Sequence, residues 1–288
     1  MDYARYPLSG RFYTGAEYKK GIKIGNQFYI VKFAKDSPGG VTFSHVSEFL
    51  GSHIFELLGI PTQETRLGTY EGKPVVVMKD FIGEGETFVP FNDVGDSSLE
   101  QNKDLYHYSY QDICRMLNEN RKLTNVEETV ERFWDMYIVD ALIGNFDRHG
   151  ANWGFLKREN QYRIAPVFDN GSSLFPRLND DEKIKSVLDS EGEMERRIYG
   201  FPTSQIQLRG KKSSYYDVIR SLQFAECNEA VRRIYPRVNL AGIKELIDSI
   251  EDLSTLRKEF YFEIVQSRYE KLIKEPYKML AASERSNE

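Results

Sequence analysis

The feature that most constrains this chain is a long apolar segment that ends at a polar loop. Residues 126–143 are rich in apolar side chains and contain neither Gly nor Pro, a pattern typical of a buried helix. Gly144 follows directly, and glycine commonly ends a helix. The loop after it, residues 145–152, is mostly polar. We therefore predict a rigid core helix that presents this loop at its carboxyl end.

Most of the strand-like runs lie in the first eighty residues. A Gly25-Asn26 turn separates two apolar-rich runs and predicts a hairpin. Two further strands are expected at residues 65–70 and 74–78. Before them, the apolar residues within 46–58 recur at the spacing of one helix face, and Ser44 is placed to cap that helix. This order predicts a small lobe built on one sheet.

After residue 81 the pattern is mostly helical. Two strand-like runs, residues 153–156 and 162–168, follow the polar loop. Amphipathic helices are expected at residues 240–250 and 256–273, and a short helix at residues 111–117. The second half of the chain therefore predicts a lobe built mainly of helices.

These patterns predict an α+β fold with two lobes. Residues 1–81 are expected to form a β-rich N-lobe, residues 82–280 a mainly helical C-lobe, and residues 281–288 a flexible tail. Hydrophobic residues make up 40% and charged residues 29% of the 288 residues, the balance of an ordinary globular protein. A core large enough for two lobes is therefore expected.

Composition also excludes some classes of function. The net charge of −5 argues against a dedicated nucleic-acid binder, because such proteins need a basic surface. Cys114 and Cys227 lie far apart without metal-ligand spacing, so neither a zinc site nor a disulfide framework is expected. No stretch approaches the roughly 20 apolar residues of a membrane helix. We expect a cytoplasmic protein without membrane or direct nucleic-acid partners.

Two polar motifs carry the residue types that phosphoryl transfer requires. The reaction needs one carboxylate to orient the attacking hydroxyl, and a carboxylate with an amide oxygen to hold Mg²⁺. Asp147 lies five residues before Asn152, the offset of kinase catalytic loops. Downstream, the turn at Asn170-Gly171 leaves Asp169 at the end of an expected strand. A single Asp or Asn most often caps a turn, but the ordered combination favours an ATP- and Mg²⁺-dependent phosphotransferase.

A cation is also needed to hold the phosphates, and Lys32 is the candidate. It ends a Tyr-Ile-Val-Lys strand, as the ATP-binding lysine of kinases does. Glu48 is its candidate partner, but helical periodicity places Glu48 opposite the apolar stripe. An ion pair and a solvated carboxylate are therefore both open. Gly15 and Ala16 are candidates for a loop that covers the phosphates, with a plain flexible turn as the alternative.

Two basic residues, Arg148 and His149, directly follow Asp147. As cations or hydrogen-bond donors they are candidates for a catalytic role. Either could steady the phosphate groups or the loop itself, and the sequence leaves both interpretations open.

The two motifs, residues 145–153 and residues 165–172, resemble those of the HipA-like serine/threonine kinases. The resemblance implies a protein-kinase-like fold with a HipA-like arrangement of lobes, and ATP and Mg²⁺ as cofactors. It also implies site residues: Asp147 as catalytic base, Lys32 on the phosphates, Asn152 and Asp169 on Mg²⁺, and Lys79, Asp80 and Phe81 as hinge contacts to adenine.

The resemblance further implies autophosphorylation, and it leaves secretion or translocation into host cells open beside the cytoplasmic location that we expect. Ser9, Tyr13 and Thr14 are candidate targets, because a hydroxyl in a phosphate loop can reach the active site. HipA toxins carry a further subdomain before the kinase core, whereas this chain begins almost at its phosphate loop. We therefore do not expect a toxin that inhibits translation.

Two alternatives remain open at this stage. Lipid and small-molecule kinases are the first, because phosphoinositide kinases also use an Asp-Arg-His loop that ends in Asn. The second is a non-catalytic nucleotide-binding module of a toxin-antitoxin system with an antitoxin-like partner. Asn170 in place of the usual Phe and a glycine loop without the full triple-glycine pattern leave it open. The protein substrate is not disclosed by the sequence.

Overall fold

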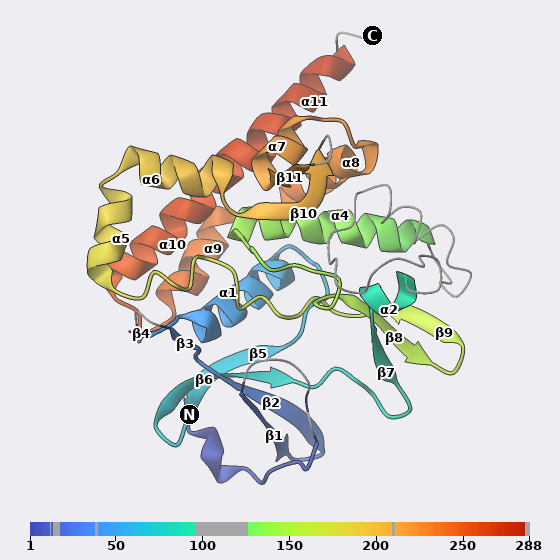
Figure 1. Ribbon diagram of the computed structural model, residues 1–288, viewed down its shortest axis with the longest axis vertical. Coiled ribbons are helices and arrows are strands. Elements are labelled where there is room, and N and C mark those ends of the chain that lie inside the picture. Colours follow the sequence, from blue (N-terminus) through green and yellow to red (C-terminus); the bar gives the residue numbers. More distant parts are fainter. Residues whose placement is uncertain (12, 14–17, 38–39, 96–125, 209–210, 286–288) are drawn as a thin grey trace.

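The computed structural model describes the chain apart from residues 12, 14–17, 38–39, 96–125, 209–210 and 286–288. Figure 1 shows the amino-terminal strands gathered at one end of the molecule and the helices at the other. The predicted α+β fold with two lobes is confirmed. The short helix expected at residues 111–117 lies outside the described residues.

The small lobe is built on an antiparallel sheet of four strands. Their order is β1 (Lys19–Ile24), β2 (Gln27–Phe33), β6 (Lys73–Lys79) and β5 (Thr65–Tyr70). The predicted hairpin is present, and Gly25 at its turn has a φ of +60°, which glycine adopts at little cost. The four expected strands are therefore confirmed.

Helix α1 (Ser44–Leu57) packs against β5 and β6. The capping role expected for Ser44 is wrong, because Phe43 occupies the N-cap position without a side-chain hydrogen bond. The Ser44 hydroxyl instead accepts a hydrogen bond from Thr42 Oγ1 at 3.2 Å and another from Lys35 N at 3.4 Å. The Ser44 hydroxyl oxygen therefore accepts hydrogen bonds from residues that precede the helix.

A second sheet follows the small lobe, with the order β7 (Thr87–Pro90), β8 (Gly154–Arg158) and β9 (Gln161–Ile164). The strand expected at residues 162–168 is shorter than predicted, because β9 ends at Ile164. Pro166 cannot donate a backbone hydrogen bond, and Val167 forms a bridge to Thr62 instead. The chain therefore leaves the hairpin before it reaches Asp169.

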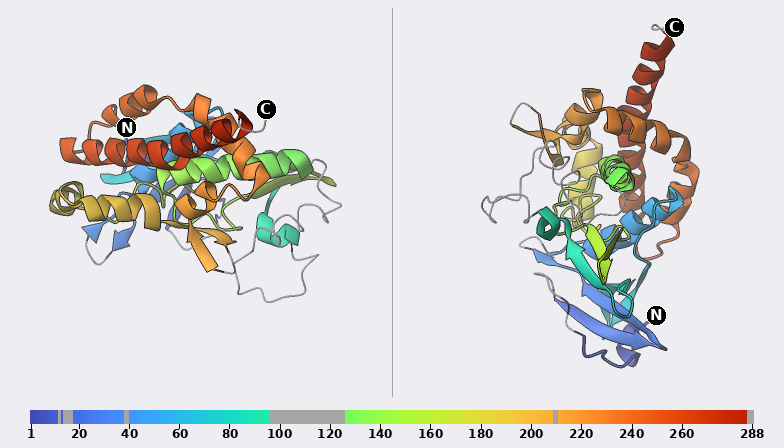
Figure 2. Two further views of the ribbon diagram at one scale, coloured as in Figure 1. Left: turned by 90° about the horizontal axis from the view of Figure 1, so that it is seen from above. Right: turned by 90° about the vertical axis from the view of Figure 1, so that its right-hand side faces the viewer.

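Helix α4 (Val126–Ile143) has the bounds that the sequence predicts. Figure 2 shows it end-on at the centre of the helical lobe. Trp134, Ile138 and Leu142 are fully buried on it. The helices and strands around and beyond it are: α2 (Phe91–Gly95), α5 (Asp181–Leu188), α6 (Glu191–Glu195), β10 (Thr203–Leu208), β11 (Lys211–Ser214), α7 (Tyr215–Arg220), α8 (Ala225–Ile234), α9 (Leu240–Asp248) and α10 (Thr255–Arg268).

The carboxyl-terminal helix is longer than expected. After α10 a π-helical turn (Tyr269–Lys274) leads into α11 (Glu275–Arg285), which therefore extends past residue 281, where we placed the tail. Glu284 near its end is held by Arg232 of α8 at 2.5 Å. Among the described residues, no helix combines the length and apolar character needed to cross a membrane.

Helix α1 belongs to the core of the helical lobe. Its Val46, Leu50 and Ile54 join the large apolar cluster that is centred on α4, whereas the small sheet has a separate cluster of its own. On another face, α1 approaches the loop after β9 so closely that a Cβ on Gly51 would lie 2.6 Å from Asn170 Cβ. Glycine is therefore required at this contact.

We predict that Gly51→Ala lowers the free energy of unfolding by about 1–3 kcal/mol, because either the helix or the loop must move. Denaturant unfolding measures this. Gly192→Ala in α6 is the matched control, since a Cβ there meets nothing within 4 Å and alanine favours helix. Unchanged stability of Gly51→Ala would contradict the close packing.

Candidate functional site

Lys32 on β2 lies between two carboxylates. Its Nζ is 3.1 Å from Glu48 Oε2 on α1 and 2.8 Å from Asp169 Oδ1. Glu48 is fully buried, so of the two interpretations open for it, the structure contains the ion pair. The face of α1 opposite the apolar stripe is covered by the loop around Asn170 rather than by water, which helical periodicity alone does not reveal.

The second oxygen of Glu48 holds the loop that carries Asp169. Glu48 Oε1 accepts a hydrogen bond from Asn170 N at 2.7 Å. The Asn170 side chain donates to Ser52 Oγ at 3.0 Å and accepts from Arg148 Nη2 at 2.6 Å. Asn170 is fully buried with its polar atoms paired. A phenylalanine at this position would leave the Arg148 donor without this acceptor.

Arg148 connects three segments through its guanidinium. It pairs with Asp140 on α4 through Nε and Nη2, at 2.8 and 3.1 Å. Nη1 donates to the carbonyl oxygens of Asn152 and Phe168. Burial disfavours the charged guanidinium, but Asp140 outweighs this and raises the pKa of Arg148. Two roles were left open for Arg148, steadying the phosphate groups or steadying the loop. Its contacts in the structure steady the loop.

Asp147 lies at the open side of this network. Its backbone N–H donates to Asn145 Oδ1 at 3.1 Å, and its carbonyl accepts from Asn152 Nδ2 at 2.8 Å. The side chain is about half exposed at 52%. Partial burial, with the nearby charge of Asp169, raises the pKa of Asp147 above its ordinary value, although His149 acts in the opposite direction.

His149 lies close to Asp147 without a tight contact. Its Nε2 is 3.9 Å from Asp147 Oδ1, and its Nδ1 accepts a hydrogen bond from Ala151 N at 3.2 Å. The imidazole therefore closes the turn of the loop and also faces the Asp147 carboxylate.

Asp169 has a strained backbone and a stabilised charge. Its φ of +57° lies in the left-handed region, which side-chain-bearing residues rarely adopt. Burial alone would raise the pKa of Asp169, but the ion pair with Lys32 outweighs burial and lowers it. The next-but-one residue, Gly171, would place a Cβ 3.2 Å from Glu48 Oε2. These contacts hold Asp169 as an anion in one position.

An apolar pocket adjoins Lys32. Phe81, Phe88 and Phe168 form a cluster with ring centroids 5.1 to 6.2 Å apart. With Ile30 and Met78 they line a cavity of about 160 Å³ that reaches Lys32, Glu48 and Asp169. The pocket therefore has an apolar part and a charged end.

The predicted hinge lies at the rim of this pocket. Asp80 and Phe81 line it, and Ile82 is a lining residue that the sequence did not single out. The Asp80 carboxylate accepts hydrogen bonds from Arg11 Nη1 at 2.6 Å, Tyr13 Oη at 3.0 Å and Ile82 N at 3.0 Å.

Lys79 is turned away from the pocket and is not among its lining residues. Its backbone is occupied by hydrogen bonds to Glu64 and Gln63, and its ammonium lies 3.5 Å from Glu64. Gly15 and Ala16 lie outside the described residues.

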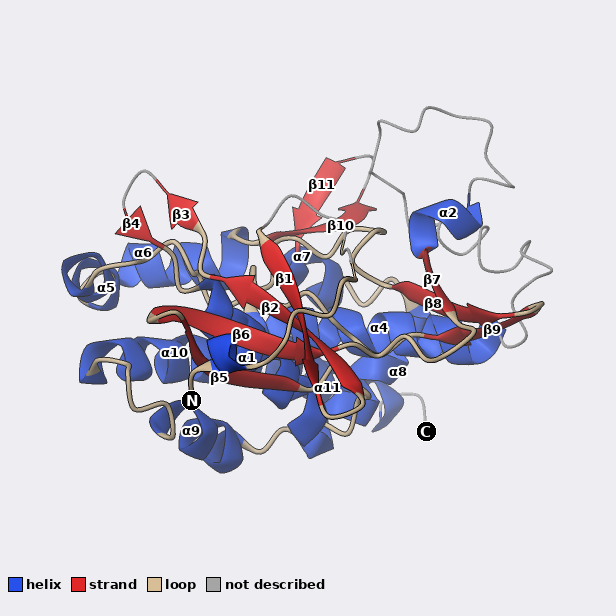
Figure 3. Ribbon diagram, turned by 90° about the horizontal axis from the view of Figure 1, so that it is seen from below, coloured by secondary structure: helices blue, strands red, loops and turns tan. Residues whose placement is uncertain are grey.

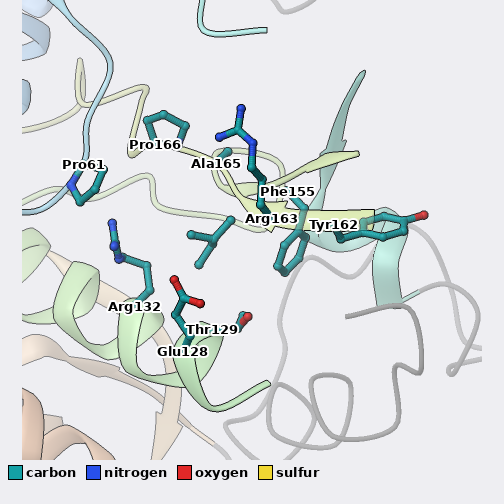
Figure 4. Close-up of a pocket in the computed structure, with 10 residues that line it drawn as sticks. Pro61, Glu128, Thr129, Arg132, Phe155, Tyr162, Arg163, Ala165 and Pro166 are labelled. Atoms are coloured by element: carbon teal, nitrogen blue, oxygen red, sulfur yellow. The ribbon is translucent and has the colours of Figure 1, made fainter. Parts of the chain in front are cut away.

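A second cavity, of about 320 Å³, lies elsewhere, between α4 and the β8–β9 hairpin. Figure 4 shows Arg132 of α4 and Arg163 of β9 on its two sides. None of the predicted site residues lines it. We therefore place the candidate site at Lys32.

The whole arrangement matches one protein family. Residues 13–252 match the family model described as the HipA-like C-terminal domain. The chain belongs to the HipA-like family. It is 36% identical, over 262 residues, to the serine/threonine-protein kinase CtkA of Helicobacter pylori, and the match covers 88% of this chain and 80% of CtkA.

Solved structures agree with this membership. The crystal structure of CtkA, described as a proinflammatory kinase of Helicobacter pylori, superposes with a TM-score of 0.90 at 33% identity and covers 97% of both chains. HipA of Shewanella oneidensis, solved with HipB and operator DNA, gives a TM-score of 0.57 at 14% identity over 96% of this chain and 70% of that one. The latter likeness shows the fold alone.

Several site residues of this HipA-like chain were not predicted from the sequence. Asp140, Phe88 and Phe168 stood in apolar stretches, and Arg11 preceded the expected phosphate loop. Only Asp140 gave a signal, as an acidic residue within an otherwise apolar helix segment. Such a residue needs a buried partner.

We predict that Lys32→Met raises the pKa of Asp169, because burial then acts without the opposing ammonium. Carbon-13 NMR titration of the Asp169 carboxyl measures this. Because its folded-state pKa is lowered, Asp169 contributes stability that is lost as the pH falls through that pKa. The stability gap between wild type and Lys32→Met should therefore narrow in acid. An identical Asp169 titration in both proteins would contradict the ion pair.

Proposed function

We propose that this chain is a serine/threonine protein kinase that transfers the γ-phosphoryl group of ATP, with Mg²⁺, to a protein hydroxyl, its own included. The observation that carries the proposal is Lys32, held between Glu48 and Asp169 at the charged end of an apolar pocket. Family membership and the likeness to CtkA support the same class.

In this proposal the apolar pocket receives adenine. Phe81, Phe88 and Phe168 offer aromatic surface, and the backbone near Asp80 supplies the hinge contacts. Lys32 binds the phosphates, and Glu48 keeps its ammonium in place. Gly15 and Ala16 stay predictions for the loop that covers the phosphates.

Asn152 and Asp169 would hold Mg²⁺. Both offer oxygen ligands, which Mg²⁺ prefers, and the ion normally completes its shell with water and substrate phosphates. The described residues contain no cluster of three or more His, Cys, Asp or Glu side chains suited to a metal. A Mg²⁺ site with few protein ligands, completed by nucleotide phosphates, agrees with this finding.

Asp147 would orient the attacking hydroxyl and receive its proton. The hydroxyl oxygen bonds to the γ-phosphorus, the bond from that phosphorus to the bridging oxygen breaks, and ADP leaves. The raised pKa of Asp147 suits a group that must accept a proton. Its partial exposure leaves it accessible to a substrate.

The non-catalytic alternative rested on Asn170 and on the abbreviated glycine loop, of which residues 14–17 lie outside the described residues. Because Asn170 has a structural role between Ser52 and Arg148, its departure from the usual Phe is no sign of a lost activity. The choice between protein and lipid acceptors rests on the relationship to CtkA. An antitoxin-like partner stays a prediction.

We predict that Asp147→Asn keeps folding and ATP binding but lowers phosphoryl transfer by about two to four orders of magnitude. Labelling of the protein itself and of a generic Ser/Thr substrate with radiolabelled ATP measures this. The exposed Asp189→Asn is the control and should transfer normally. Turnover like that of wild type in Asp147→Asn would remove Asp147 from the mechanism.

We also predict that Asn152→Ala raises the Mg²⁺ concentration for half-maximal transfer by about tenfold or more, the range for losing a contact to a metal site. Titration of activity with Mg²⁺ at saturating ATP measures this. Asn179→Ala, outside the site, should leave the requirement unchanged. A requirement equal to that of wild type in Asn152→Ala would place the ion elsewhere.

A further inference from the structure

Residues 7–11 and Tyr13, which we call the amino-terminal strap, run from one edge of the small sheet to the pocket at the hinge. The strap first pairs with the edge strand β1, where Ser9 N donates a hydrogen bond to Gly21 O at 2.9 Å. A Cβ on Gly21 would lie 2.9 Å from Tyr13 Cε2, so the strap lies directly on β1. Figure 3 shows β1, β2 and β6 beside one another in the sheet. The hinge residue Asp80 follows β6, so the strap passes β2 to reach it.

Arg11 makes this crossing along Phe28 of β2. Its guanidinium carbon lies 3.8 Å from the centroid of the Phe28 ring. The guanidinium then reaches the Asp80 carboxylate, with Nη1 2.6 Å from Oδ2. The backbone N–H of Asp80 donates to Phe28 O at 2.9 Å. The strap, β2 and the hinge therefore meet at these three residues.

Tyr13 adds a second tie to the same carboxylate and also belongs to the pocket. Its hydroxyl donates to Asp80 Oδ2 at 3.0 Å. Burial and the Asp80 carboxylate raise the pKa of Tyr13, so the hydroxyl keeps the proton that it donates. Tyr13 lines the pocket that reaches Lys32 and Asp169. A change at Asp80 therefore alters the wall of the pocket through Tyr13.

The tie is fixed on the hinge side. Asp80 is only 6% exposed, and its Oδ1 accepts a hydrogen bond from Ile82 N at 3.0 Å. The Asp80 carbonyl oxygen accepts another from Gln27 Nε2 at 3.1 Å. The side chain of Arg11, by contrast, is 40% exposed. The strap is therefore the part that moves when the tie is broken.

We propose that Asp80 is a positioning residue of the nucleotide site: through Arg11 and Tyr13 it holds the strap at the rim of the pocket and slows the release of bound nucleotide. Segments that close over a bound substrate often set the rate at which product leaves. The inference rests on the proposed function, because the retained ligand is the ATP or ADP of that reaction. The ion pairs of Lys32 do not include the strap, so nucleotide release responds more than the transfer step.

The tie is tested on the full chain with Mg²⁺ and a fluorescent ADP that carries an N-methylanthraniloyl group on its ribose. Stopped-flow displacement by excess ADP gives the release rate without phosphoryl transfer. Asp80→Asn keeps the shape of the side chain and removes its charge. It should speed release about tenfold, near the lower end of the range for hydrogen bonds to charged groups. The exposed Asp189→Asn is the matched control and should release like wild type. Equal release by Asp80→Asn and wild type would overturn the proposal.

Asp80 also holds Ile82 N, so two variants on the strap separate the tie from the hinge. Tyr13→Phe keeps the ring and removes only the hydroxyl, and Arg11→Gln removes the cation. Each should speed release at least threefold. Arg11→Gln combined with Asp80→Asn should release no faster than Asp80→Asn alone, because both changes remove the same tie. Effects that multiply in the double variant would show independent roles and overturn the tie.

The split between KM and kcat distinguishes this inference from the proposed function. With a generic Ser/Thr substrate, Asp80→Asn should raise the KM for ATP more than it lowers kcat. Faster release in all three variants of a chain that transfers no phosphate would count against the kinase function and leave the strap standing. Normal transfer with unaltered release in the three variants would overturn the strap and leave the kinase function standing.

Discussion

The site depends on a buried ion pair that joins the two lobes. Lys32 comes from the small sheet, Glu48 from a helix whose apolar face belongs to the larger core, and Asp169 from the loop that follows the second sheet. Removing one member of the buried Lys32–Glu48 pair typically costs about 3–5 kcal/mol, since the other charge stays behind unpaired, whereas the Asp169 side chain is 36% exposed and water screens its contribution. The ion pair therefore ties the relative position of the lobes to the presence of all three charges.

A second buried network fixes the loops on the other side. Arg148 is held by Asp140 on the central helix and binds carbonyl oxygens before and after the β8–β9 hairpin. Through Asn170 this network meets the first one at Ser52 and Glu48. Of the side chains that we propose for chemistry, Asp147 is half exposed at the open side of this frame, whereas Asn152 is buried and donates to the Asp147 carbonyl oxygen. Such a frame can hold the strained backbone of Asp169.

Much of the fold and part of the site could be predicted, because the features that specify them are local in the sequence. The central helix, the first hairpin and the offset from Asp147 to Asn152 follow from periodicity, turn chemistry and spacing. The environment of the Glu48 side chain could not be predicted from the sequence. A helical face opposite an apolar stripe is either exposed to solvent or covered by a distant loop. Here the loop covers it. The premature end of β9 and the inward-facing Asn170 likewise result from contacts with residues more than 100 positions away. Such contacts leave no periodic signal.

The proposed function requires one arrangement, in which oxygens of two loops and the ammonium of Lys32 converge on a metal-bound triphosphate. A crystal structure with a non-hydrolysable ATP analogue and Mn²⁺ in place of Mg²⁺ measures it directly, because the anomalous signal locates the ion. We predict adenine among Phe81, Phe88 and Phe168, and the ion about 2.0–2.3 Å from an oxygen of Asp169, as expected for a hard divalent cation. A nucleotide bound outside this pocket, or an ion away from Asp169, would contradict the account.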